Sequence, residues 1–203
     1  PVNVDDLGVD YLSVSGHKFH APKGVGFLYV REGASLEPFM NGGHQEGAMR
    51  GGTENVAGIV AMAAAAREAC ENMASDAARI AALRDELEWR ILAEIADTCV
   101  NGTAPRVPGT LNVSFAGIDS ASLVELLDER GVCAAGGSAC SSHEGEPSHV
   151  LVAMGLPSER TQSALRFSLS NETTQDDIDY TVGVLKACSE QLQPFALLDL
   201  SSF

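Results

Sequence analysis

The sequence predicts an α/β fold, because short strand-like runs alternate with longer helix-like runs along its 203 residues. Runs rich in β-branched and aromatic residues recur between segments whose apolar residues follow a helical spacing. Hydrophobic residues make up 45% of the chain, which is enough to form a core. A mean hydropathy near zero excludes disorder as the main state.

A polar segment separates the first two expected strands, which cover residues 9–14 and 25–30. A lysine at the end of a buried strand is costly to keep charged, so burial there favours the neutral amine that attacks a carbonyl group. Lys18 occupies this position. The hydroxyl of Ser15 and the ring of His17 precede it and suit a phosphate. The alternative is a surface hairpin whose turn contains an ordinary lysine.

The stretch over residues 41–55 is rich in glycine and carries Thr53. Glycines permit a close approach of the backbone to a ligand or to another chain. Composition alone favours the simpler interpretation, a solvent loop with an ordinary threonine.

Two helices are expected next, an alanine-rich one over residues 56–73 and a second one from Ser75 and Asp76, which act as its cap, to about Asp97. A stripe of apolar residues on the second helix predicts that one of its faces is buried. The stripe consists of Ile80, Leu83, Leu87, Ile91 and Ile95. We expect a domain boundary at the break between the helices, with residues 1–74 before it and residues 75–203 after it.

Shorter elements follow this boundary. Asp119 is placed to cap one helix and Gly131 to end it. Acidic residues in the first turns of the last helix suit the helix dipole. The expected strands cover residues 110–115, 132–135 and 164–169, and the expected helices cover residues 119–130, 148–154 and 174–192.

The loop over residues 136–146 carries Cys140 among glycine, serine and alanine. A structural cysteine usually has apolar neighbours, so small polar neighbours predict an exposed and reactive thiol. The other four cysteines lie in expected helices or short strands, and we expect them to be inert. An odd number of cysteines without a Cys-x-x-Cys pair indicates a reducing, cytoplasmic compartment.

Arg166 lies in an apolar run, where a strand holds its guanidinium in a position that suits a two-point contact with a carboxylate. The alternative is an edge-strand arginine that faces water. No metal site is expected, because the spacing of the nearest candidate ligands fits no standard zinc pattern. Those candidates are Cys133, Cys140, His143 and His149.

The chain has 13 basic and 28 acidic residues and a formal charge of −15. This balance excludes a nucleic-acid surface, which needs a stripe of basic residues. No apolar run approaches the roughly 18 residues of a membrane span, so a membrane is not an expected partner either.

Residues 15–26, Ser-Gly-His-Lys-Phe-His-Ala-Pro-Lys-Gly-Val-Gly, resemble the cofactor-lysine segment of the cysteine desulfurases. These are fold-type-I enzymes of the class-V aminotransferase family that use pyridoxal 5'-phosphate (PLP). The resemblance continues in the order of the family through three further motifs. They lie in residues 42–55, 137–142 and 165–169.

The resemblance implies that residues 1–74 are the last part of the large PLP-binding domain and that residues 75–203 are the small α+β domain. It implies that Lys18 bonds to PLP and that Ser15 and His17 hold the phosphate. Thr53 matches a position whose hydroxyl reaches the phosphate of the other subunit, which implies a homodimer.

The resemblance also implies the reaction. Arg166 binds the α-carboxylate of L-cysteine, and Cys140 takes the substrate sulfur as a persulfide while L-alanine is released. A sulfur-acceptor protein, either an iron–sulfur scaffold or a sulfur carrier for thio-modification, then receives the sulfur.

In this family the cofactor lysine lies near the middle of a chain about twice as long, so we interpret the sequence as a C-terminal half. The groups that face the PLP ring would then precede Pro1, and the chain alone would bind PLP weakly or not at all. Three alternatives remain, a related class-V aminotransferase, a selenocysteine lyase and a non-catalytic half that dimerises. Cys140 argues against a plain aminotransferase, which has no use for a thiol there.

Overall fold

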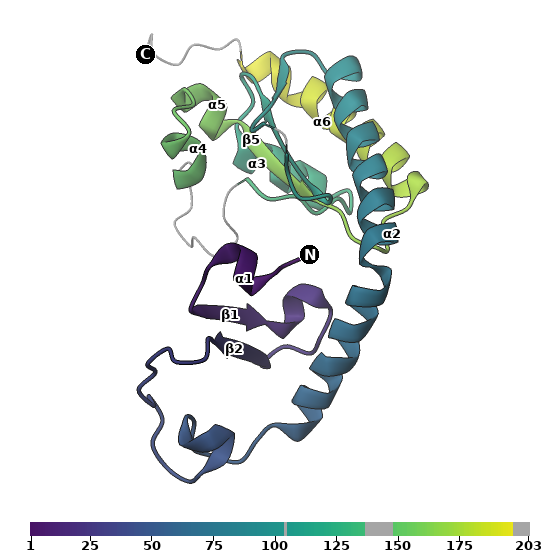
Figure 1. Cartoon of the computed structure of the whole chain (residues 1–203). Helices are drawn as coiled ribbons and strands as arrows, with labels where there is room; N and C mark the ends of the chain where they lie inside the picture. Colours follow the sequence, from purple (N-terminus) through teal and green to yellow (C-terminus); the bar gives the residue numbers. More distant parts are fainter. Residues whose placement is uncertain (104, 137–147, 197–203) are drawn as a thin grey trace. The chain divides into compact units, whose positions relative to one another are not determined.

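The computed structural model describes residues 1–103, 105–136 and 148–196. The chain divides into two compact units, unit 1 over Pro1–Ala74 and unit 2 over Ser75–Phe203. Each unit contains helices and its own antiparallel sheet (Figure 1). The α/β class predicted from the sequence is therefore confirmed.

Unit 1 is built around a two-stranded antiparallel sheet. The strands run in register from Tyr11 opposite Val30 to Ser15 opposite Gly26. The unit's elements are α1 (Val4–Leu7), β1 (Tyr11–Ser15), the 3-10 helix η1 (Gly16–Phe19), β2 (Gly26–Val30), the 3-10 helix η2 (Gln45–Ala48) and the first part of α2 (Val56–Glu94).

Glycines allow the end of this hairpin to close tightly. A Cβ atom on Gly26 would lie 2.4 Å from the carbonyl oxygen of Val14, and one on Gly16 would lie 2.9 Å from that of Val25. The backbone N–H of Gly16 donates to the Val25 carbonyl at 2.9 Å. The chain can therefore leave β1, form η1 and return to β2 only with glycine at both positions.

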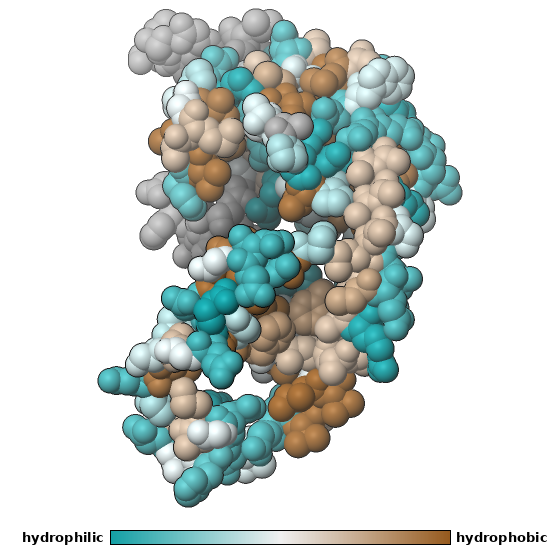
Figure 2. All heavy atoms as spheres, in the orientation of Figure 1, coloured by the Kyte–Doolittle hydropathy of each residue, from teal (hydrophilic) through white to brown (hydrophobic). Residues whose placement is uncertain are grey.

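Neither strand of unit 1 contains a buried residue. Tyr11, Phe27 and Leu28 are exposed, and an isolated two-stranded sheet is marginally stable at best. Figure 2 also shows hydrophobic surface where α2 begins, at exposed residues that include Val56 and Val60. The prediction of a buried strand before Lys18 is wrong for this chain.

α2 is one continuous helix of 39 residues, Val56–Glu94. The predicted break and cap at Ser75 and Asp76 are therefore wrong. Serine and aspartate favour caps, but alanine and other good helix formers surround them, and neither glycine nor proline is near. The predicted apolar stripe does face the core, because Leu87, Ile91 and Ile95 are buried.

Unit 2 has a three-stranded antiparallel sheet in the order β3-β4-β5, covered on one face by helices (Figure 1). Alternate residues of the two longer strands are buried in the core, with α3 and α6 packed there. The elements are β3 (Thr98–Val100), β4 (Thr110–Phe115), α3 (Ser120–Asp128), α4 (His149–Ala153), α5 (Ser158–Gln162), β5 (Ala164–Ser168) and α6 (Gln175–Ala196).

The predicted strand over residues 132–135 is wrong, since only Ala135 forms a β-bridge. Its partner is Arg166, and each backbone N–H donates to the other residue's carbonyl, at 3.1 Å from Ala135 and 2.7 Å from Arg166. The bridge extends the sheet by one residue beyond β5.

Candidate functional site

Lys18 lies in η1, directly after β1 ends at Ser15. Its side chain and that of His17 are exposed, so the predicted desolvation of the lysine does not occur in this chain. No ion pair to Lys18 is found within the described ranges. The amine is therefore accessible to a ligand without first breaking a salt bridge.

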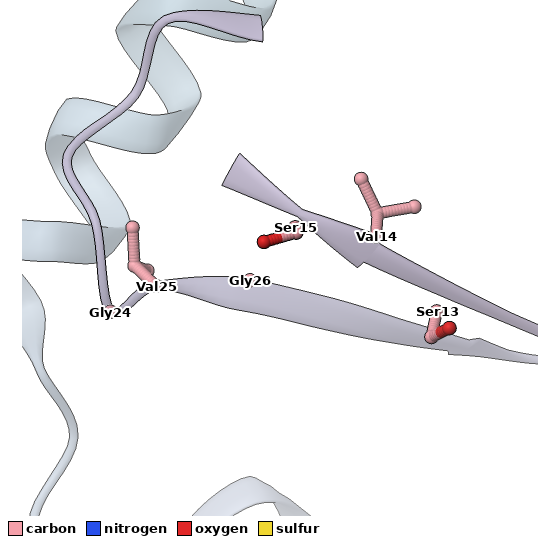
Figure 3. Close-up of a pocket in the computed structure, with 6 residues that line it drawn as sticks. All are labelled: Ser13, Val14, Ser15, Gly24, Val25 and Gly26. Carbon is pink, nitrogen blue, oxygen red and sulfur yellow. The ribbon is translucent and has the colours of Figure 1, made fainter. Parts of the chain in front are cut away.

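A first hollow of about 360 Å³ lies where β1 ends and β2 begins (Figure 3). Ser15 lines it, opposite the Gly24–Gly26 backbone. Ser13 also lines it, and the two hydroxyl groups point in different directions (Figure 3). The predicted phosphate-binding serine thus lies at a concave surface.

A second hollow of about 230 Å³ shares the Gly24–Gly26 wall with the first. Thr53 lines it, so the hairpin and the glycine-rich loop meet within unit 1. Arg50 lines it as well and donates from Nη1 to the Gly51 carbonyl at 3.2 Å. Arg50 is not among the site residues predicted from the sequence, although a cation directly before the Gly-Gly-Thr run could have pointed to it.

Unit 1 carries side chains of the kinds that fit two ends of PLP, but the structure does not bring them into one hollow: Ser15 and Thr53 line different ones, and Lys18 and His17 line neither. Hydroxyl groups such as those of Ser15 and Thr53, with the ring of His17, are donors for a phosphate. Lys18 supplies an accessible primary amine for a carbonyl group. Gly26 leaves no room for a side chain beside Val14, so the backbone itself forms the wall shared by both hollows.

Arg166 is half-buried in β5, between Asn112 of β4 and Ala135. Its Nε is buried and has no hydrogen-bond partner in the part of the chain that the structure describes. A buried donor without a partner costs about 1–3 kcal/mol. β5 is an outer strand of the sheet, but Arg166 is half-buried there, and its unpartnered Nε suits a side chain that receives an anionic ligand.

Cys140 lies outside the described residues, so the structure does not test its predicted exposure. Cys70, Cys99 and Cys133 are free and exposed, whereas Cys188 is buried. Burial raises the pKa of the Cys188 thiol. Cys133 precedes the bridge at Ala135 instead of lying in a strand, so that part of the prediction is wrong.

Two of the four candidate metal ligands, Cys140 and His143, also lie outside the described residues. Within the described ranges, no group of three or more histidine, cysteine, aspartate or glutamate residues could hold a metal ion. None of the helices described here combines the length and the apolar composition needed to cross a membrane.

Comparisons with known proteins identify the family of the chain. The family model for class-V aminotransferases matches residues 1–181. The cysteine desulfurase IscS of Dictyoglomus turgidum is 45% identical over 194 residues, which are 95% of this chain and 49% of that protein. The chain thus spans about half the length of the curated relatives it matches.

Solved structures show the same partial coverage. A NifS-like protein is 34% identical, with a TM-score of 0.83 over 95% of this chain and 49% of its own. SspA in complex with cysteine is 31% identical, with a TM-score of 0.61 over 85% of this chain and 47% of its own. The resemblance inferred from the motifs is confirmed. Since the family model covers more than half of its residues, the chain belongs to the class-V aminotransferase family.

Proposed function

We propose that this chain is part of a PLP-dependent cysteine desulfurase, which takes the sulfur of L-cysteine and releases L-alanine. The observation that carries the proposal is the position of Lys18. Its amine is exposed in the short helix that follows Ser15, and Ser15 lines the first hollow. The similarity to a cysteine desulfurase along 95% of the chain supports the same assignment.

Unit 1 would hold the cofactor. Lys18 would attach PLP through its amine, while Ser15 and His17 donate hydrogen bonds to the phosphate. Thr53 would donate to the phosphate bound by a second copy, which makes the enzyme a homodimer. When bound, PLP supplies an electron sink for bond cleavage beside the substrate's amino group.

Unit 2 would hold the substrate and accept its sulfur. The half-buried guanidinium of Arg166 would bind the α-carboxylate of L-cysteine, with its unpartnered Nε as one donor. Cys140 would hold the sulfur as a persulfide and pass it to a sulfur-acceptor protein, an iron–sulfur scaffold or a sulfur carrier. The exposed free thiols of Cys70, Cys99 and Cys133 support a reducing compartment, and we place the enzyme in the cytoplasm.

Two lysines of the same hairpin provide a matched test in the complete enzyme. Lys18→Ala should abolish the visible absorption of bound PLP and the release of alanine from L-cysteine, because it removes the attaching amine. Lys23→Ala removes another exposed cation five residues later and should preserve both. Absorption spectra and an alanine assay decide the matter. Loss of the band in Lys23→Ala but not in Lys18→Ala would contradict the assignment.

The same assay separates the alternative functions. A class-V aminotransferase would convert its amino-acid substrate to a keto acid, and a selenocysteine lyase would prefer selenocysteine to cysteine. A non-catalytic half would show neither the absorption band nor any product.

A further inference from the structure

Four residues form one row across the sheet of unit 2: Asn101, Asn112, Arg166 and Ala135. The backbone N–H of Asn101 donates to the Asn112 carbonyl at 2.8 Å, Asn112 pairs with Arg166 across β4 and β5, and Ala135 bridges Arg166. Residues directly opposite one another in an antiparallel pair place their side chains on the same face. Asn112 and Arg166 are therefore side-chain neighbours on the face away from the core.

Arg160 fixes the orientation of the Asn101 amide. Its Nε and Nη2 donate to the side-chain oxygen of Asn101 at 3.1 and 2.8 Å. A guanidinium only donates, so the atom that faces it must be Oδ1. The Asn101 nitrogen, Nδ2, is consequently turned the other way. It donates to Asn112 Oδ1 at 2.8 Å and to Ser114 Oγ at 2.7 Å.

Ser114 strengthens this orientation, because its hydroxyl donates its own proton to the Arg160 carbonyl at 2.7 Å. The Ser114 oxygen can therefore only accept from Asn101. Asn101 and Ser114 are both more than 90% buried, so water does not compete for these bonds. Arg160 therefore fixes the direction of the hydrogen bonds in the network, from Arg160 to Asn101 and from Asn101 to Asn112.

The network leaves hydrogen-bond donors beside Arg166 that no described residue uses. Asn112 Oδ1 accepts from Asn101 and receives no hydrogen bond from the Arg166 guanidinium, whose buried Nε has no partner within the described ranges. The Asn112 side-chain nitrogen likewise donates to no described residue. An amide N–H₂ and a guanidinium side by side are complementary to a carboxylate, which accepts through two oxygens.

We propose that Asn112 binds the α-carboxylate of the substrate together with Arg166, and that Arg160 and Asn101 are positioning residues that turn the Asn112 amide toward it. The inference rests on the proposed function for the identity of the substrate. The site itself requires only a small carboxylate.

The kinetic test uses Asn112→Asp in the complete enzyme. The variant keeps the shape of the side chain but replaces the donor by an anion, which repels the substrate carboxylate. The KM for L-cysteine should rise about tenfold or more while kcat changes little. This result is expected when the lost contact binds the substrate and the transition state equally well. Asn171→Asp, an exposed position of unit 2, adds the same charge elsewhere and should leave both constants unchanged. Equal KM values for the two variants would overturn the proposal.

A binding test is independent of the reaction. In the 203-residue chain, the side-chain amide resonance of Asn112 should shift on titration with propionate and stay in place with propionamide, which has the same size and no charge. If the resonance shifts but the complete enzyme releases no alanine from L-cysteine, the proposed function is refuted and the carboxylate site is retained. Absence of a shift with propionate would overturn the site, whatever the enzyme does.

Discussion

The two units differ in where their apolar residues lie. Unit 2 contains every member of the buried hydrophobic cluster, including Leu111, Phe115 and Leu165. Among the described residues, the buried hydrophobic part of unit 1 is Ala21, while Phe27 and Leu28 of its sheet are each 48% exposed. The two sheets therefore have the same antiparallel pairing but different sources of stability.

The difference shows that regular hydrogen bonding between strands does not by itself make a sheet stable; side-chain packing on one face is also needed. The hairpin of unit 1 has complete register and the glycines that its shape demands, yet two strands without a buried face are marginal in water. The β4–β5 pair has a comparable ladder, and one of its faces is closed by helices. We therefore expect unit 2 to provide nearly all of the cooperative stability of the chain.

The largest expected effect is the loss of a core side chain from unit 2. Leu165→Ala removes a fully buried leucine from β5 and should lower the free energy of unfolding by about 2–5 kcal/mol. Leu28→Ala removes the same atoms from β2, where about half of the side chain is already in water.

The Leu28→Ala variant should therefore lose about 1.5 kcal/mol at most, which is half of the upper value for fully burying a leucine. Urea titrations of the 203-residue chain followed by circular dichroism measure both changes. Equal losses would show that unit 1 has a core of its own and would remove the contrast between the units.

A feature of this fold could be predicted where neighbouring residues in the sequence determine it. The strands over residues 110–115 and 164–169 match β4 and β5 closely, and in the first of them the alternation of apolar and polar residues marks the buried face. The break at Ser75 failed, because a local cap preference does not outweigh helix formers on both sides. The predicted burial of the strand before Lys18 failed for another reason: a local pattern shows which residues a strand could bury, but not whether another element covers them.

The candidate site follows the same rule. Ser15 and Thr53 could be predicted from motifs, and both line hollows along Gly24–Gly26. The role of Asn112 could not be predicted, because in the sequence it is an ordinary polar residue of a correctly predicted strand. Its orientation depends on Asn101, which Arg160 of α5 orients in turn, and these residues meet only when the sheet and α5 are assembled.

The polar network allows a second and smaller test of the contrast. Asn101→Ala removes the acceptor of Arg160 and the donor to Ser114 in a buried position. Leaving such partners unsatisfied should lower the free energy of unfolding by about 1–3 kcal/mol. Asn41→Ala, in an exposed loop of unit 1, should be close to neutral. Denaturation midpoints compare the two variants, and a neutral Asn101→Ala would mean that water replaces the lost partners.

The smallest expected effect concerns the start of α6, where a purely local device contributes to unit 2. The Asp177 carboxylate accepts from the backbone N–H and the hydroxyl of Thr174, both at 2.8 Å. These bonds, the one from the backbone first, hold the pKa of Asp177 below its usual range. A lowered pKa in the folded state means that the stabilisation is complete above the pKa of the unfolded chain and is lost as the pH falls through the folded value.

Asp177→Asn should therefore be less stable than the native chain at pH 7, and the difference should shrink as the pH falls below about 4, the usual pKa of an aspartate. Asp176→Asn is the matched control, because it removes a charge from the same first turn and leaves both Thr174 bonds intact. Urea midpoints at several pH values measure the difference. If Asp177→Asn and Asp176→Asn lost stability equally at every pH, the charge near the helix end would explain the effect, and the paired bonds to Thr174 would contribute nothing of their own.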